Sequence, residues 1–304
     1  MSSLATYGDP IELGDQRVLR PGKVLWLRSL LWMIGFTFLL VLSFGPLGET
    51  LKSLAPAADL PLQFAVQCLG AGIALAVYVL LVRLGEDRWP SELAIKPMLP
   101  ELLTGLLLGL LMFSAVMAIL TASGAYETQM IGSQPAWRAA GSAIEAGVVE
   151  ELIIRGVILR LLWRGFGPAV AFAVSAALFG AGHLPNPESS LFAAVCIALE
   201  AGIMLGAFYA LTGRLWVSIG VHVSWNFTQG YLFGAAVSGG DLGPAFATST
   251  ARAGYPEWLT GGAFGPEASL PALVVCTSVG VAGLAAAWKM GRLKDPQMHI
   301  RTTA

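Results

Sequence analysis

The chain has 304 residues, of which 56% are hydrophobic and only 12% are charged, and its formal net charge is −1. Soluble domains contain about 25% charged residues, so this composition indicates a polytopic membrane protein. It excludes a disordered chain, a nucleic-acid-binding protein that relies on phosphate attraction and a small disulfide scaffold. Residues 1–24 are polar and lead into the first apolar run without a signal-peptide cleavage site, so we expect a cytoplasmic N-terminal segment.

Eight apolar stretches follow, and a helix needs roughly 20 such residues to cross a bilayer. The predicted spans are 25–46, 62–84, 101–122, 137–163, 167–184, 189–211, 215–236 and 269–289. The fold class is therefore all-α, a transmembrane helical bundle with one membrane domain over 25–289 and a cytoplasmic tail over 290–304. Residues 237–268 are rich in Gly, Pro and Thr and are expected to form a loop or an interfacial cap.

The distribution of basic residues predicts the orientation. Fourteen of the eighteen Lys and Arg residues fall on the side of the membrane that holds both ends of the chain, and three fall on the other side. Arg155 is the remaining one and lies within a span. Because cytoplasmic loops carry the excess of Lys and Arg, both termini are expected to be cytoplasmic.

Ionisable side chains inside the spans are the most informative feature of the sequence, because such groups are costly in a membrane and usually functional. Glu151 and Arg155 are one helical turn apart and can form an ion pair that supports the helix. Glu150 points about 100° away from Glu151, so it is available as a general base. Glu145 and Glu200 also lie in spans, but each could equally hold helices together, and we assign neither to chemistry.

Two of the three histidines also lie in or at the end of spans. His183 ends the segment Phe179-Gly180-Ala181-Gly182-His183, where a capping role is an alternative to a catalytic one. His222 and Asn226 are one turn apart, so both can direct hydrogen-bond donors at one point, as an oxyanion requires. Polar pairs also join membrane helices, so the prediction depends on all three groups occurring in closely connected spans.

These groups occur in the order Glu150-Glu151-x-x-x-Arg155, Phe179-x-x-x-His183 and His222-x-x-x-Asn226. In this order they resemble the three motifs of the CPBP family, the CAAX-processing and bacteriocin-processing membrane endopeptidases, also called Abi or type II CAAX proteases. The resemblance covers about residues 130–235, which would form the catalytic core.

The resemblance implies an intramembrane endopeptidase of the glutamic type. Glu150 and His183 would activate a water molecule, and that water would attack the scissile carbonyl of a membrane-anchored peptide or protein. The substrate could be prenylated or carry a C-terminal sorting tail. His222 and Asn226 would stabilise the oxyanion, while Glu151 and Arg155 would support the site.

No cofactor is expected, although zinc remains an alternative in which Glu150, His183 and His222 would be the three ligands. The zincin motif His-Glu-x-x-His does not occur in the sequence. The cysteines Cys68, Cys196 and Cys276 lie in separate apolar runs, which favours buried packing over a disulfide or a zinc site.

Two other functions use the same residues. A proton-coupled transporter would place buried carboxylates and histidines in a proton relay, but transporters often consist of repeated halves, and no repeat is evident here. A non-catalytic membrane scaffold of the same fold would be expected to lose one of the motifs. We expect the lipid bilayer and a membrane-anchored substrate as partners, no nucleic acid, and a location in a prokaryotic plasma (inner) membrane.

Overall fold

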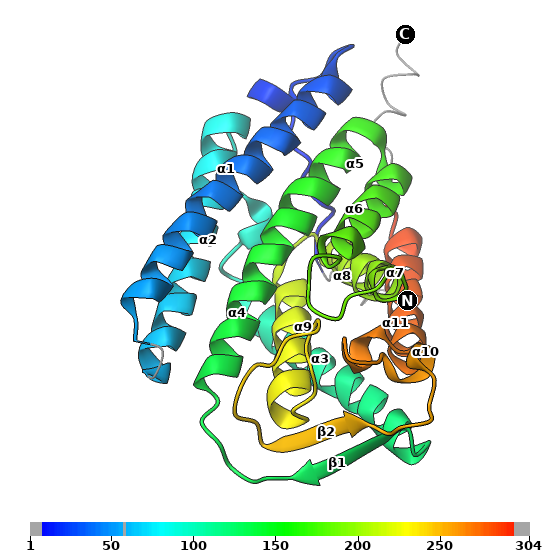
Figure 1. The fold of residues 1–304 in the computed structure, drawn as a ribbon. Helices are drawn as coiled ribbons and strands as arrows, with labels where there is room; N and C mark the ends of the chain where they lie inside the picture. The colour runs from blue at the N-terminus through cyan, green and yellow to red at the C-terminus, as the bar shows by residue number, and fades with distance from the viewer. Residues whose placement is uncertain (1–7, 57–58, 295–304) are drawn as a thin grey trace.

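The computed structural model of the protein describes residues 8–56 and 59–294. Residues 1–7 and 295–304, which include His299 and parts of the predicted cytoplasmic segments, lie outside the described residues. Within the described ranges the chain forms a bundle of helices with one small sheet at its lower end (Figure 1). The helices are α1 (Leu25–Leu54), α2 (Leu60–Glu86), α3 (Met98–Ala122), α4 (Trp137–Glu151), α5 (Arg160–Phe166), α6 (Pro168–Gly182), α7 (Leu191–Ile197), α8 (Ile203–Thr212), α9 (Trp216–Phe227), α10 (Glu257–Thr260) and α11 (Leu270–Lys289).

Three segments with π-helical hydrogen bonding extend or join these helices. They are η3 (Leu152–Leu159) between α4 and α5, η4 (Ala198–Gly202) between α7 and α8, and η5 (Thr228–Leu232) after α9. Short 3₁₀ turns, η1 (Arg17–Leu19), η2 (Ser91–Leu93) and η6 (Pro266–Ala268), lie in the connections. When the π-helical segments are included, a helical stretch lies at each of the eight predicted positions.

Five helical stretches among the described residues are long and apolar enough to cross a membrane. They are Leu25–Pro46, Leu60–Glu86, Met98–Ala122, Leu191–Thr212 and Leu270–Lys289. Large apolar side chains such as Leu31 and Phe38 of α1, Leu80 of α2 and Leu111 of α3 are more than half exposed. Such surfaces suit contact with lipid chains, and they support an integral membrane protein. The count of eight spans and the cytoplasmic termini remain predictions.

The part of the chain predicted as a loop or cap, 237–268, contains a strand that the sequence did not indicate. Strand β2 (Ala247–Ala251) pairs antiparallel with β1 (Tyr126–Met130), so that Tyr126 lies opposite Ala251. The Tyr126 hydroxyl donates to the carbonyl of Thr260 in α10 at 3.0 Å. This is the one sheet within residues 8–56 and 59–294, and it fastens the cap to the end of α3.

Glycines allow the helices around the site to approach closely. A Cβ on Gly105 of α3 would lie 2.4 Å from the carbonyl oxygen of Val217, and one on Gly220 of α9 would lie 2.6 Å from that of Leu102. Gly147 of α4 in turn faces the side chain of Val223 in α9. Small residues at these positions let backbones pack against one another, as is common between membrane helices. The α9 helix is thereby held between α3 and α4.

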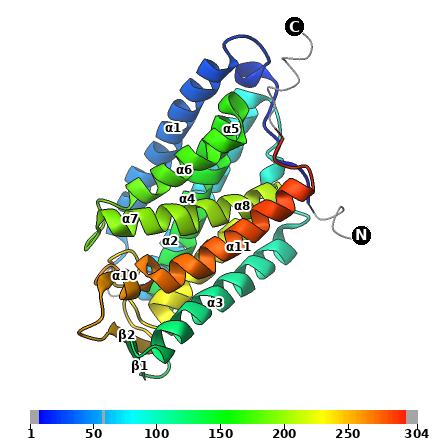
Figure 2. The same ribbon diagram turned by 90° about the vertical axis from the view of Figure 1, so that its right-hand side faces the viewer.

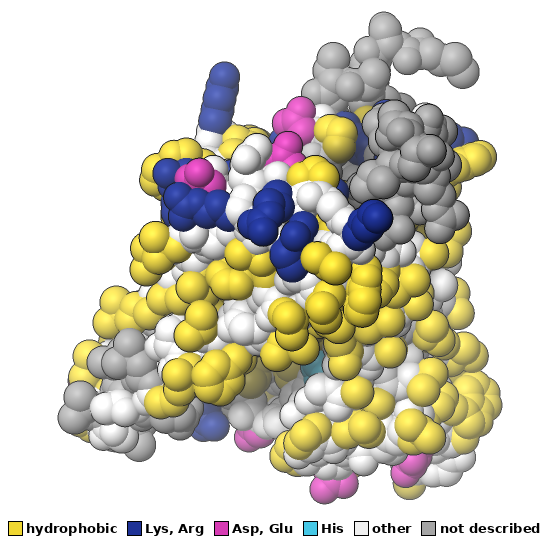
Figure 3. All heavy atoms as spheres, turned by 90° about the horizontal axis from the view of Figure 1, so that it is seen from above, with side chains coloured by type: hydrophobic (Ala, Val, Ile, Leu, Met, Phe, Trp, Pro, Cys, Tyr) yellow, Lys and Arg dark blue, Asp and Glu magenta, His cyan; other side chains and the backbone are white. Residues whose placement is uncertain are grey.

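The segment before α1 closes one end of the bundle. The Asp9 amide donates to the carbonyl of Thr212 at 3.0 Å, and its carboxylate pairs with Arg214 at 3.1 Å. Arg292, which follows α11, donates to the carbonyl of Gly8 at 2.8 Å. Figure 2 shows this segment running along the ends of α8 and α11, and Figure 3 shows Lys and Arg side chains gathered on the same end of the molecule.

Candidate functional site

A cavity of about 210 Å³ lies inside the bundle, between α4, α6, α9 and the helix formed by α7, η4 and α8. Its lining includes the four residues predicted to be catalytic, Glu150, His183, His222 and Asn226. The structure therefore brings into one cavity three motifs that come from different helices. The helices α4, α7 and α9 all supply lining residues, and each leads directly into a π-helical segment. Such departures from α-helical geometry often occur at functional sites.

Glu150 lies at the end of α4 and its side chain is 37% exposed. Its Oε2 atom is nevertheless buried and has no hydrogen-bond partner among the described residues. The same atom lies 3.8 Å from Nε2 of His222. The Glu150 carboxylate is thus held near the His222 imidazole, and its Oε2 atom is available to bind a water molecule.

Glu151 points to the other side, into the protein. Its Oε1 atom accepts a hydrogen bond from Arg155 at 2.7 Å and lies 3.0 Å from Nδ1 of His222. Glu151 and Arg155 are both completely buried. The predicted ion pair is therefore confirmed, and the structure adds that the same carboxylate oxygen orients His222.

Phe179 connects the two histidines. Its ring centroid lies 4.9 Å from the ring of His183 and 6.2 Å from that of His222, and the guanidinium of Arg155 lies 4.6 Å above it. Arg155 also donates to the carbonyl of Ala201 at 2.7 Å. The spacing Phe179-x-x-x-His183 thus has a structural meaning here, since the two rings are one helical turn apart and pack against each other.

His183 follows the last residue of α6. Its Nδ1 lies 2.8 Å from the carbonyl oxygen of Phe179, so Nδ1 carries a proton when it donates there. In the neutral ring Nε2 is then left as an acceptor. A capping role alone does not account for the position of His183, because its ring also lines the cavity.

Two further carboxylates line the same cavity, Glu200, which the sequence left without an assigned role, and Glu267, which the sequence did not indicate. Glu200, in η4, is 1% exposed, and its Oε2 atom has no hydrogen-bond partner among the described residues. Glu267, in η6, accepts from the amide of Ser238 at 2.5 Å and from its hydroxyl at 2.8 Å. Burial raises the pKa of Glu267, while the hydrogen bonds from Ser238 act in the opposite direction.

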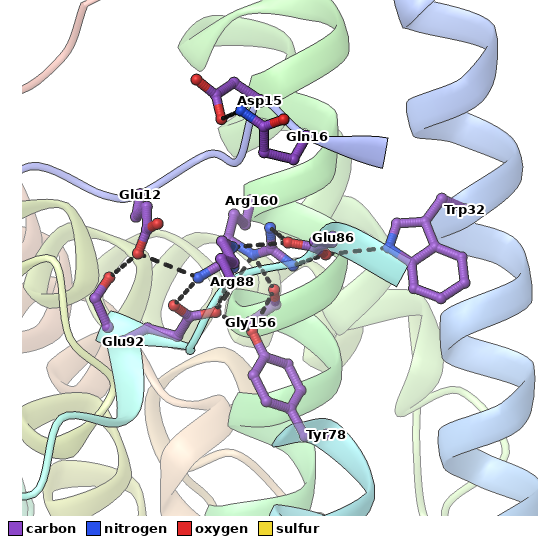
Figure 4. Close-up of polar contacts among 11 residues, drawn as sticks. Glu12, Asp15, Gln16, Trp32, Tyr78, Glu86, Arg88, Glu92, Gly156 and Arg160 are labelled. Carbon is purple, nitrogen blue, oxygen red and sulfur yellow. Dashed lines mark hydrogen bonds and ion pairs between the residues drawn. The ribbon is translucent and has the colours of Figure 1, made fainter. Parts of the chain in front are cut away.

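A buried ion-pair network holds the other end of η3 (Figure 4). Arg160 forms a bidentate pair with Glu86 at 2.7 and 2.8 Å, and Arg88 forms another with Glu92 at 2.8 Å. The hydroxyl of Tyr78 lies 2.5 Å from Glu92 Oε1 and 3.0 Å from the carbonyl oxygen of Gly156.

Burial opposes the ionisation of Glu92, but its hydrogen bonds with Arg88 and the charge of Arg160 outweigh burial and lower its pKa. The network therefore consists of charged groups that neutralise one another. It fixes the π-helical segment that starts directly after Glu150 and Glu151, so it positions the helix on which both glutamates stand.

The three residues considered as zinc ligands, Glu150, His183 and His222, do not form a metal centre in this arrangement. Among the described residues, no three His, Cys, Asp or Glu side chains gather so that they could hold a metal ion. His222 already uses Nδ1 toward Glu151, and Glu150 lies 3.8 Å from its Nε2. Cys196 and Cys276 are buried, as predicted, whereas Cys68 is only half-buried.

Apolar helices that enclose carboxylates, imidazoles and an amide around one cavity define a membrane protein with a polar site inside the bundle. Residues 132–228, about one third of the chain, match the family model described as "Type II CAAX prenyl endopeptidase Rce1-like". This match confirms the resemblance that the three motifs indicated, and the matched family is one of proteases. No curated protein and no solved structure matches the chain.

Proposed function

We propose that the protein is an intramembrane endopeptidase that hydrolyses a peptide bond of a membrane-anchored substrate with water activated by Glu150 and His183. The observation that carries the proposal is the convergence of Glu150, His183, His222 and Asn226 on one cavity of about 210 Å³. The name of the matched family supports a prenylated substrate, and the lipid-facing helices support cleavage at the membrane.

In the proposed first step, a water molecule bound to Glu150 and Nε2 of His183 gives its proton to one of these groups. The water oxygen forms a bond to the carbonyl carbon, and the carbonyl electron pair moves to its oxygen. When this intermediate collapses, the C–N bond breaks and the proton passes to the leaving amine. General-base catalysis of this kind contributes about 10²–10⁴-fold to a rate.

The oxyanion would be stabilised by Asn226 and by His222. For His222 to donate from Nε2 while Nδ1–H donates to Glu151, the ring must be an imidazolium. The carboxylates of Glu151, at 3.0 Å, and Glu150, at 3.8 Å, lie on its two sides and stabilise that positive charge. A pre-oriented oxyanion donor is worth about 10²–10³-fold in kcat.

The test compares new peptide ends in cells that express the protein or its Glu150→Gln variant, followed by cleavage of the substrates found with purified protein in liposomes. Glu150→Gln should lower kcat by about 10²-fold or more while the protein stays folded. Glu145→Gln is the matched control, because Glu145 lies on the same helix beside Gly70 of α2 and is not among the residues that line the cavity.

Full activity of Glu150→Gln would reject Glu150 as the base. The transporter alternative makes a different prediction for the same liposomes, namely proton or solute flux that depends on these carboxylates without the release of peptide fragments. A scaffold would show neither activity, and its partners would be unaffected by the Glu150→Gln substitution.

A further inference from the structure

We infer that Glu200 and Glu267 form a subsite that binds a cationic side chain of the substrate, a lysine ammonium or an arginine guanidinium, close to the scissile bond. The inference rests on the proposed function, because it assigns a specificity to the same cavity. It concerns groups that the proposed hydrolysis does not use.

Both carboxylates are deeply buried and reach the cavity from elements outside the three motifs. Glu200 is 1% exposed and Glu267 is 3% exposed, and both line the cavity. They come from neighbouring elements, because α7, which continues into η4, packs against η6. Buried carboxylates are normally paired with a cation or satisfied by hydrogen bonds, so such a pair needs a specific explanation.

The hydrogen bonds of the two groups differ in a way that suggests an unfilled position. Ser238 supplies two hydrogen-bond donors to Glu267. Glu200, by contrast, leaves Oε2 buried and without a hydrogen-bond partner among the described residues. A bound cationic group with several N–H donors would donate a hydrogen bond to the unpaired oxygen of Glu200 and at the same time neutralise the charge of Glu267. An ammonium has three such donors and a guanidinium has five.

The charge of the cavity favours a cation and disfavours an anion. Its described lining contains three glutamates and two histidines but no lysine or arginine. The guanidinium of Arg155 lies behind Phe179 and is engaged by Glu151 and the carbonyl of Ala201. No lysine or arginine among the described residues therefore lines the cavity to offset Glu200 and Glu267.

The apolar part of the cavity lining is suited to a long side chain. Ile197, Met204, Leu205 and Leu242 line the cavity and offer apolar contacts for methylene groups. Lysine and arginine combine an apolar stem with a charged tip, so the stem would pack along these residues while the tip meets the glutamates. A free C-terminal carboxylate would be repelled from this position.

The subsite can be tested with lipid-anchored, internally quenched peptides in liposomes that contain the full-length protein. The peptides are identical except for one residue, which is Lys, norleucine or Glu, and this residue is placed in turn at each position around the cleaved bond. Norleucine keeps the stem of lysine and lacks the ammonium. The wild type should prefer Lys to norleucine at one position by about tenfold or more in kcat/KM.

Glu200→Gln and Glu267→Gln should each lower that preference to about threefold or less. Glu257→Gln, at an exposed position in α10, is the matched control and should keep the wild-type preference. A wild-type enzyme that cleaves the peptides without preferring Lys at any position would overturn the inference and leave the proposed hydrolysis intact. The same conclusion follows if the preference survives in both variants.

A binding measurement separates the inference from catalysis. The probe is n-hexylammonium, with 1-hexanol as its neutral counterpart, and the readout is the Tm of the Glu150→Gln protein, which cannot use Glu150 as a base. Hexylammonium should raise the Tm in a saturable manner and hexanol should not, because only a ligand of the folded state stabilises it. The rise should disappear when Glu200→Gln is added, and equal effects of the two probes would overturn the inference even if no peptide is cleaved.

Discussion

Glu151 and Arg155 provide a sharp test of how the site is held together. Their side chains are completely buried and 2.7 Å apart. Removing one partner of a buried ion pair leaves the other charge uncompensated, so Glu151→Gln and Arg155→Met should each lower the free energy of unfolding by about 3–5 kcal/mol. The double variant leaves no uncompensated charge and should lose only about 2 kcal/mol or less, since neutral replacements of a buried pair are often tolerated.

The free energies of unfolding of the wild type, the two single variants and the double variant can be measured by titrating SDS into mixed micelles. The same double-mutant cycle on the exposed pair Glu127–Arg252 serves as the control. That pair is 3.5 Å apart with side chains about half exposed, so its coupling should be within about 1 kcal/mol of zero. The proposed peptidase activity should stay low in the double variant, because His222 has lost the carboxylate of Glu151 that orients its ring. Additive losses of the two single substitutions would refute the reasoning that the pair is a buried, mutually neutralising unit.

Three further outcomes follow from the structure. Gly180→Ala should lower the free energy of unfolding by about 1–3 kcal/mol and should also lower activity. The new Cβ would lie 2.2 Å from the carbonyl oxygen of Ala194 and push α6, with His183, away from α7. A variant with wild-type Tm and kcat would contradict this. Tyr78→Phe should lower the free energy of unfolding by about 1–3 kcal/mol, since the buried Glu92 loses a partner, and chemical denaturation against the wild type measures it. Activity should survive dialysis against a strong chelator, and a loss that zinc restores would show metal dependence.

The positions of the helices could be predicted from the sequence because each helix buries or exposes a long apolar run, and such runs are visible without tertiary information. The three motifs could be predicted for a related reason. Glu150, His183 and His222 are costly groups within apolar surroundings, so each position is marked by its own neighbours.

The remaining features depend on contacts between distant parts of the chain. The strand Tyr126–Met130 is short and polar, and its partner lies more than a hundred residues later, so no local pattern identifies the pair. Glu267 lies in a turn without helical periodicity, and its place in the cavity depends on how the cap folds back. Glu200 was recognised as an intramembrane acid, but only the packing of η4 shows that it faces the cavity.

The burial of several arginines could not be predicted from the sequence. Arg88, Arg160 and Arg214 belong to the fourteen basic residues assigned to the side that holds both termini, and the structure buries all three, with Arg160 completely inaccessible. Local sequence indicates that a basic residue lies near the end of a span, but not that it meets Glu86 or Glu101 from another helix. Long-range ion pairs of this kind require the fold to be known.

The bonds of Gly8 and Asp9 also bear on when the protein can finish folding during its synthesis. Arg292 donates to the carbonyl of Gly8, and these two residues are 284 positions apart, so the segment before α1 is made long before this partner. Thr212 and Arg214, the partners of Asp9, also leave the ribosome long after it. The helices between them can enter the bilayer as they are made, but this end of the bundle can close only after Arg292 has left the ribosome. Nascent chains stalled before Arg292 should therefore be cut near Gly8 by an added protease that spares the released protein.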